Sequence, residues 1–179
     1  VLLRKVRRKT ALGSVAGAIL VAAVGVDALL IEPTWLEVSH VRLATRKIDR
    51  PVRIVVLADL QTDVFGPYEK SVLRQVLAEK PDLVLLAGDY IQANSETRGK
   101  LIPQIRTYLK EIEFSAPAGT FAIRGNVDSD EWTKIFATLP ITTAQETRPF
   151  QLPQLKLTCL AMHDSFNPSA AIRNPAPER

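Results

Sequence analysis

The sequence is poor in the residues that many metal-binding and redox sites use. It contains 1 cysteine and 2 histidines among 179 residues. A single cysteine excludes an internal disulfide and any zinc site built on several cysteines. No glycine-rich loop follows the apolar run 54–58, which excludes a P-loop or a dinucleotide-binding turn at that point. A dinuclear metal centre usually draws on more than two histidines.

Positive charge is in excess only in the first ten residues. Of the 23 Lys and Arg residues, five lie in residues 1–10, and the rest of the chain has 18 against 19 acidic residues. The net charge of +4 is thus a property of the N-terminus. A nucleic-acid-binding domain needs its basic residues clustered on the folded part. We therefore expect no nucleic-acid partner.

Residues 11–31 form a long apolar segment in which Asp27 is the only charge. This length suffices to span a bilayer. The basic residues 1–10 are expected to stay cytoplasmic under the positive-inside rule, so residues 32–179 would lie outside the cytoplasm. An uncleaved, single-pass signal anchor is the preferred interpretation. A cleaved signal peptide and a buried core helix are the alternatives.

Residues 34–44 alternate between apolar and polar side chains, which predicts an antiparallel or edge strand. His40 lies in this segment, and we interpret it as a partly exposed strand residue rather than a metal ligand. A charged connection, residues 47–51, leads from there into the next strand.

Two buried strands, each followed by an aspartate, form the centre of the sequence. Residues 54–58 are a short apolar run rich in β-branched residues, typical of a strand covered on both faces, and Asp59 follows it. An amphipathic helix is predicted over residues 68–80. A second apolar strand, residues 82–86, leads to Asp89. A strand–helix–strand unit places both strand ends at one edge of a sheet, where two carboxylates repel unless a cation or proton lies between them.

A third strand repeats this design. After a predicted helix over residues 96–113, residues 118–123 read as a strand that leads to Asn126. A helix is predicted to begin near Ser129. Asp128 and Glu131 have capping-box spacing, so a role as helix N-cap is a structural alternative for Asp128. Three short β segments then follow Pro140: residues 141–143, 148–152 and 155–161.

The three strand ends read Asp59-Leu60-Gln61, Gly88-Asp89-Tyr90 and Gly125-Asn126-Val127-Asp128. In order and spacing these blocks resemble the calcineurin-like metallophosphoesterase family, and with the N-terminal segment they resemble its membrane-anchored bacterial branch. The resemblance covers roughly residues 32–165. It implies an α/β fold of the αββα sandwich type, incomplete here, with residues 32–179 as the N-terminal part of the domain. It also implies hydrolysis of a phosphoester or pyrophosphate bond at a site with two divalent metal ions.

The resemblance assigns metal-binding roles to four residues. Asp59 matches a ligand of the first metal, Asp89 the carboxylate that bridges both metals, and Asn126 a ligand of the second. Gln61 stands where the family has a metal-binding histidine. Its oxygen suits Mn²⁺ or Mg²⁺ better than Zn²⁺ or iron, although the metal is not fixed by the sequence. No catalytic residue is assigned, because Val127 replaces the histidine that assists phosphate binding or leaving-group protonation.

The family has a later histidine and then a Gly-His-x-His block. This sequence contains neither, and His163 lacks the Gly-His-x-His pattern. Either the chain is a fragment of a longer protein, which we favour, or its site is degenerate. The main functional hypothesis is a membrane-anchored hydrolase of a phosphorylated substrate in the bacterial cell envelope, with a lipid-linked phosphate as one class. The alternative is a catalytically degenerate, membrane-tethered binding module. A flavodoxin-like receiver domain is less consistent with the third block and the β-rich segments after it.

Overall fold

The fold is described from a computed structural model, which places residues 14–15, 17–28 and 35–167. The chain divides into two compact units, Val1–Arg42 and Leu43–Arg179, which we describe separately. In the first unit, residues 14–15 and 17–26 are helical and a π turn follows at 27–28. None of the helices in these ranges is both long and apolar enough to cross a membrane. The signal anchor expected at 11–31 lies partly outside the described residues and stays a prediction.

The strand predicted over residues 34–44 is wrong for the part that the structure describes. Residues 35–44 form no strand, and His40 lies exposed within them. Alternating polarity specifies which face of a strand would be buried, but a strand also needs a partner for its backbone N–H and C=O groups. The sequence of this segment offers no information about such a partner.

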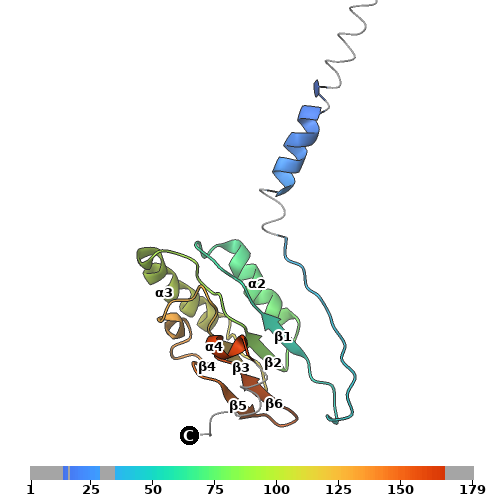
Figure 1. The fold of residues 1–179 in the computed structure, drawn as a ribbon, viewed down its shortest axis with the longest axis vertical. Helices are drawn as coiled ribbons and strands as arrows, with labels where there is room; N and C mark the ends of the chain where they lie inside the picture. The colour runs from blue at the N-terminus through green and yellow to red at the C-terminus, as the bar shows by residue number, and fades with distance from the viewer. Residues whose placement is uncertain (1–13, 16, 29–34, 168–179) are drawn as a thin grey trace, which may run out of the picture. The chain divides into compact units, whose positions relative to one another are not determined.

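The second unit is built on a parallel sheet of four strands in the order β1-β2-β3-β4 (Figure 1). Each strand pairs with the next one along the chain, for example Val56 with Leu85, Leu85 with Phe121 and Phe121 with Thr142. The carboxyl ends of β1, β2 and β3 therefore lie at the same edge of the sheet, as predicted. The bounds of the strands are β1 Ile54–Leu57, β2 Leu83–Leu86, β3 Thr120–Ile123 and β4 Thr142–Ala144.

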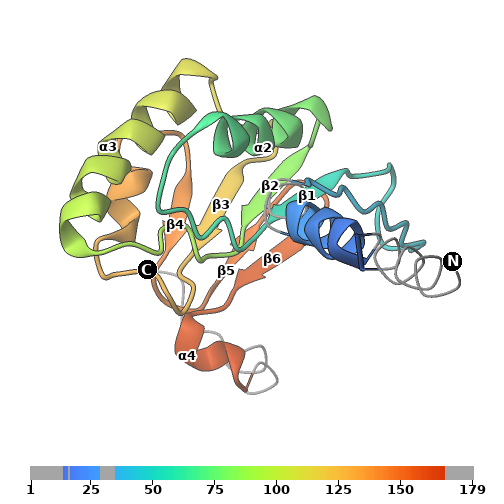
Figure 2. The same cartoon turned by 90° about the horizontal axis from the view of Figure 1, so that it is seen from above.

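The two faces of the sheet are covered by different elements. Helices α2 (Pro67–Ala78) and α3 (Ser95–Glu111) lie on one face, and the antiparallel hairpin of β5 (Arg148–Gln151) and β6 (Lys156–Cys159) lies on the other (Figure 2). Alternate side chains of β2 enter the two resulting cores. Val84 belongs to the helix-side core and Leu83 to the hairpin-side core. Burial on both faces explains why β2 contains no polar residue.

Strand β1 is covered on one face only. Val55 and Leu57 pack against the helix-side core, whereas Ile54 and Val56 are 45% and 61% exposed. The hairpin covers the opposite face at β2 to β4, where the rings of Phe121 and Phe150 lie 4.9 Å apart. The edge strand that leads to Asp59 therefore keeps an apolar face in contact with solvent.

Both long helices begin with a side chain that satisfies a free backbone donor. The Glu69 carboxylate accepts from the Gly66 N–H at 2.7 Å at the start of α2, and Pro67 occupies its first turn. Asn94 Oδ1 accepts from the Thr97 N–H at 2.9 Å at the start of α3. Both predicted helices are confirmed, with ends one or two residues from those expected.

The helix predicted to begin near Ser129 is shorter and tighter than expected. The structure has a 3₁₀ helix, η3, at Trp132–Ile135, and Asp128 does not cap it. Trp132, Ile135 and Phe136 are nevertheless all buried. The capping role is wrong because the Asp128 carboxylate binds backbone groups of other loops, as described below. A last short helix, α4, covers Met162–Ser165.

Candidate functional site

The loops after β1 and β2 run side by side beyond the ends of their strands. The N–H groups of Asp59, Gln61 and Thr62 donate to the carbonyls of Gly88, Asp89 and Tyr90, at 3.2, 2.8 and 3.1 Å respectively. Parallel pairing thus continues through the residues that the sequence singled out. The backbones that carry Asp59, Gln61 and Asp89 are held in one register.

Several of these loop residues have left-handed backbone conformations. The φ angles are 56° at Asp59, 40° at Gln61 and 58° at Asp89, and Gly88 has a φ of 94°. Residues other than glycine rarely adopt such angles, and doing so costs on the order of 1–3 kcal/mol each. Strained backbone of this kind concentrates at functional sites. Three of the four predicted metal-binding residues have it.

The loops after β2 and β3 touch each other through two glycines. A Cβ atom on Gly125 would lie 2.1 Å from Asp89 Oδ1 and 2.3 Å from Asp89 N. A Cβ atom on Gly88 would lie 2.4 Å from the Gly125 N atom. No side chain fits at either position. The two glycines therefore allow the backbones of these loops to pack directly against each other.

Asp89 is the buried carboxylate among the predicted ligands, at 9% exposure. Its Oδ1 atom accepts from the Val127 N–H at 2.9 Å, which ties Asp89 to the loop that carries Asn126. Asp59, Gln61 and Asn126 are exposed. Gln61 Nε2 lies 3.4 Å from Asp59 Oδ1, so these two side chains point toward each other. The structure thus brings Asp59 and Gln61 together and places Asn126 next to the residue that binds Asp89.

These residues offer two carboxylates and two amides, all with oxygen donors. Among the residues that the structure places, no three His, Cys, Asp or Glu side chains form a metal-binding group. Oxygen donors of this kind fit the hard cations Mg²⁺ and Mn²⁺, whereas Zn²⁺ and iron favour nitrogen and sulfur. His163 is 75% exposed on α4, with its Nε2 atom 3.4 Å from Asp164 Oδ1. The donor set is therefore compatible with an oxygen-preferring divalent cation.

Two residues that were not predicted, Asp128 and Tyr90, hold the strands and loops of the site together. Asp128 is 4% exposed, and its carboxylate accepts from three backbone N–H groups, those of Asp89, Tyr90 and Gly125. Its apparent capping-box spacing concealed this role. The Tyr90 hydroxyl oxygen lies 3.0 and 2.8 Å from the carbonyl oxygens of Leu86 and Ile123, which share its single proton, and it links β2 to β3. Burial, with the nearby Asp128 charge, raises the pKa of Tyr90 far above 10.0, so this hydroxyl keeps its proton.

Comparison with known proteins identifies the family that shares this arrangement. Residues 52–173 match the family described as calcineurin-like phosphoesterase. The chain belongs to the calcineurin-like phosphoesterase family. The match spans all three loops, the four-stranded sheet and the hairpin, and it confirms the resemblance seen in the three sequence blocks.

Phosphodiesterase YaeI from Escherichia coli (strain K12) is similar to part of the chain. The two are 35% identical over 102 residues, which is 54% of this chain and 35% of the relative. The chain thus spans about a third of the relative that it matches.

Proposed function

We propose that the protein is a metal-dependent hydrolase of phosphoester or pyrophosphate bonds. Asp59, Gln61, Asp89 and Asn126 would hold two divalent cations. The observation that carries this proposal is the packing of three strand-end loops, with oxygen donors on each, at one edge of a parallel sheet. Ligand sites of open α/β sheets lie at this edge.

The proposed ligands would have different roles because they differ in burial and in hydrogen bonding. Asp89 is buried and fixed through one oxygen by the Val127 N–H, and no donor of the described residues binds its second oxygen, which suits a ligand held between two cations. Asp59 and Gln61 are exposed and adjacent, so they can bind a cation from one side. The cations, when bound, would activate water and neutralise charge on the phosphoryl group.

The metal preference follows from the donor atoms. With Gln61 in place of a histidine, the four proposed residues supply oxygen ligands only, so we propose Mn²⁺ or Mg²⁺ rather than Zn²⁺ or iron. Val127 can neither donate nor accept a proton through its side chain. A proton required by the leaving group would come from water or from another residue. The family and the phosphodiesterase relative favour a hydrolase over the alternative of a non-catalytic binding module.

We also propose that residues 11–31 anchor the protein in a bacterial membrane, with the phosphoesterase domain outside the cytoplasm. The support is the length and apolarity of this segment behind five basic residues. This location suggests a phosphorylated lipid or envelope component as substrate, on a domain of the αββα type. Retention of the full-length protein in membranes after an alkaline carbonate wash would test the anchor, and release by the wash would contradict it.

The central experiment replaces the buried carboxylate. Asp89→Asn in the full-length protein should abolish the Mn²⁺-dependent hydrolysis of bis(p-nitrophenyl) phosphate, because it removes the charge proposed to lie between two cations. Asp49→Asn is a matched control, since Asp49 is exposed and precedes β1, whereas Asp59 follows that strand. It should leave hydrolysis unchanged. Undiminished hydrolysis by the Asp89 variant would refute the proposed site.

A further inference from the structure

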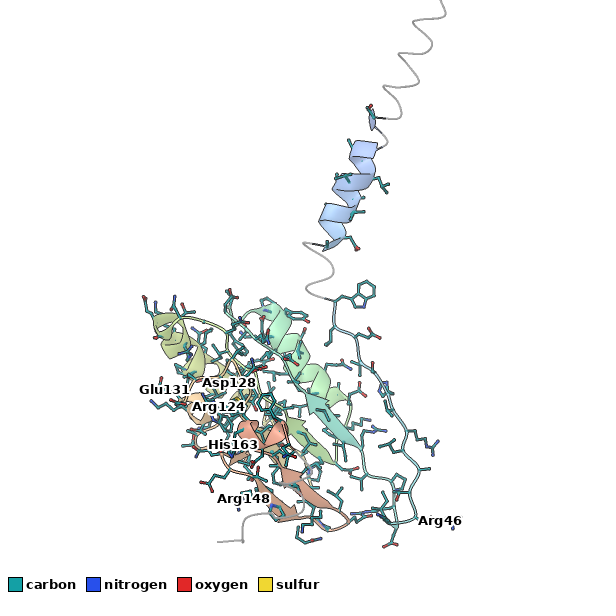
Figure 3. The ribbon with its side chains drawn as sticks, viewed as in Figure 1. Arg46, Arg124, Asp128, Glu131, Arg148 and His163 are labelled. Carbon is teal, nitrogen blue, oxygen red and sulfur yellow. The ribbon has the colours of Figure 1, made fainter. Side chains whose placement is uncertain are left out.

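Asp128 is not one of the predicted ligands. Its carboxylate nevertheless accepts more hydrogen bonds than any other carboxylate of the candidate site. Its Oδ2 atom accepts from the N–H groups of Asp89 and Gly125, at 2.8 and 2.9 Å. Its Oδ1 atom accepts from the Tyr90 N–H at 2.8 Å. A buried carboxylate is costly unless it is bonded in this way. The position of Asp128 beside Arg124 can be followed in Figure 3.

The three donors belong to the two loops that carry Asp89 and Asn126. The connection is reciprocal, because Asp89 on the β2 loop accepts from Val127 on the β3 loop. Asp128 on the β3 loop accepts in turn from Asp89 and Tyr90 on the β2 loop. We call this pair of exchanged carboxylate bonds, formed by Asp89 and Asp128, the carboxylate clasp.

Arg124 holds the main-chain carbonyl of Asp128, and thereby the residue that forms one half of the clasp. Its Nε and Nη2 atoms donate to the Asp128 carbonyl at 3.1 and 2.9 Å, and its Nη1 atom lies 2.8 Å from Asp130 Oδ1. The backbone of Asp128 is therefore held while its side chain holds the neighbouring loop. Neither the main chain nor the carboxylate of Asp128 can move without breaking bonds to the site.

The clasp acts on a predicted ligand directly. One of the bonded donors is the N–H of Asp89 itself, whose φ of 58° depends on neighbouring contacts to be maintained. A shift of this peptide moves the Asp89 carboxylate with it. A residue that only stabilised the fold would not need to bind the peptide of a ligand.

We propose that Asp128 is a positioning residue for the metal site. Its carboxylate sets the distance and orientation of Asp89 relative to Asn126, and thereby the affinity for a divalent cation. This inference rests on the proposed function, since it concerns the same site. Asp128 makes no contact with the cations or the substrate in this scheme.

The test compares Asp128→Asn with Asp49→Asn in the full-length protein, with Mn²⁺ as the probe. The asparagine places an NH₂ group against backbone N–H donors, and we expect Mn²⁺ binding about 10- to 100-fold weaker, as for other residues that orient metal ligands. The exposed Asp49 variant should bind like the wild type. Electron paramagnetic resonance measures free Mn²⁺ during the titration, and circular dichroism verifies that each variant is folded.

A second variant, Asp128→Glu, keeps both acceptor oxygens on a side chain one methylene longer. It should fold even if the asparagine variant does not, and it should also bind Mn²⁺ more weakly than the wild type because the spacing of the loops changes. Wild-type affinity in either folded Asp128 variant would overturn the inference. If the wild type binds Mn²⁺ without hydrolysing the ester, the proposed hydrolase fails while the positioning role stands on the affinity difference. A wild type that binds no Mn²⁺ overturns both.

Discussion

Gly125 offers the sharpest test of how the site is built, because the structure gives the size of the expected clash. In Gly125→Ala the new Cβ atom would lie 2.1 Å from Asp89 Oδ1, whereas real Cβ contacts essentially never fall under 3.0 Å. The Asp89 side chain must therefore retreat by about 0.9 Å or more. The clash is steric alone, since Gly125 has no left-handed φ.

The cost follows from two contributions. Overpacking of a tightly packed site destabilises by about 1–3 kcal/mol. Displacing Asp89 also weakens its hydrogen bond from Val127, and a bond to a charged group contributes about 1.5–3 kcal/mol. The free energy of unfolding should therefore fall by about 2.5–6 kcal/mol, a large part of the roughly 5–15 kcal/mol typical of a domain.

Urea unfolding followed by circular dichroism measures this change, and an Mn²⁺ titration of the folded variant measures the effect on the site. Gly99→Ala is the matched control, because nothing lies within 4 Å of a Cβ at this position in α3. It should stabilise the protein by about 0.8–1 kcal/mol through helix propensity. A Gly125→Ala protein with wild-type stability and wild-type Mn²⁺ affinity would refute the proposed packing of the loops.

Two further predictions concern Gln61 and Cys159. Gln61→His supplies a nitrogen ligand, so Zn²⁺ should gain on the order of tenfold in affinity relative to Mn²⁺ in a competition titration, and an unchanged ratio would argue that Gln61 is not a ligand. Burial raises the pKa of the Cys159 thiol from 9.0 to about 11, although the nearby Arg148 lowers it in part. The folded state then binds this proton more tightly than the unfolded state, so the free energy of unfolding should decrease between pH 9 and 11. Urea titrations should show a shallower decrease in Cys159→Ala, and an equal slope in both proteins would contradict the assignment to this thiol.

The elements that the sequence predicted well are those with a strong local signal. The apolar runs of β1 and β2, and the apolar stripes of α2 and α3, each specify an element without reference to distant residues. The burial expected on both faces is wrong for β1, because Ile54 and Val56 are exposed. The prediction that Asp59 and Asp89 emerge at one edge followed from the rule that parallel strands joined by a helix share their direction. The structure confirms this pairing.

The errors arose where the outcome depends on a partner elsewhere in the chain. Residues 35–44 alternate in polarity but form no strand. Asp128 has the spacing of a helix cap, yet its carboxylate binds backbone donors on a loop about forty residues earlier, which local patterns do not reveal. The role of Tyr90 has no local signal in the sequence, because it depends on the Leu86 and Ile123 carbonyls of two strands.

The order of the strands has a consequence for how the protein folds. Asp59, Asp89 and Asn126 follow three different strands, so they meet only after β1, β2 and β3 have paired in register. Parallel pairing between such distant segments is slow, because each loop must close before its contacts form. A cation that binds this assembled site and not the unfolded chain would stabilise the native state by mass action. The site would therefore form late in folding. Bound Mn²⁺ should then slow unfolding more than it speeds folding.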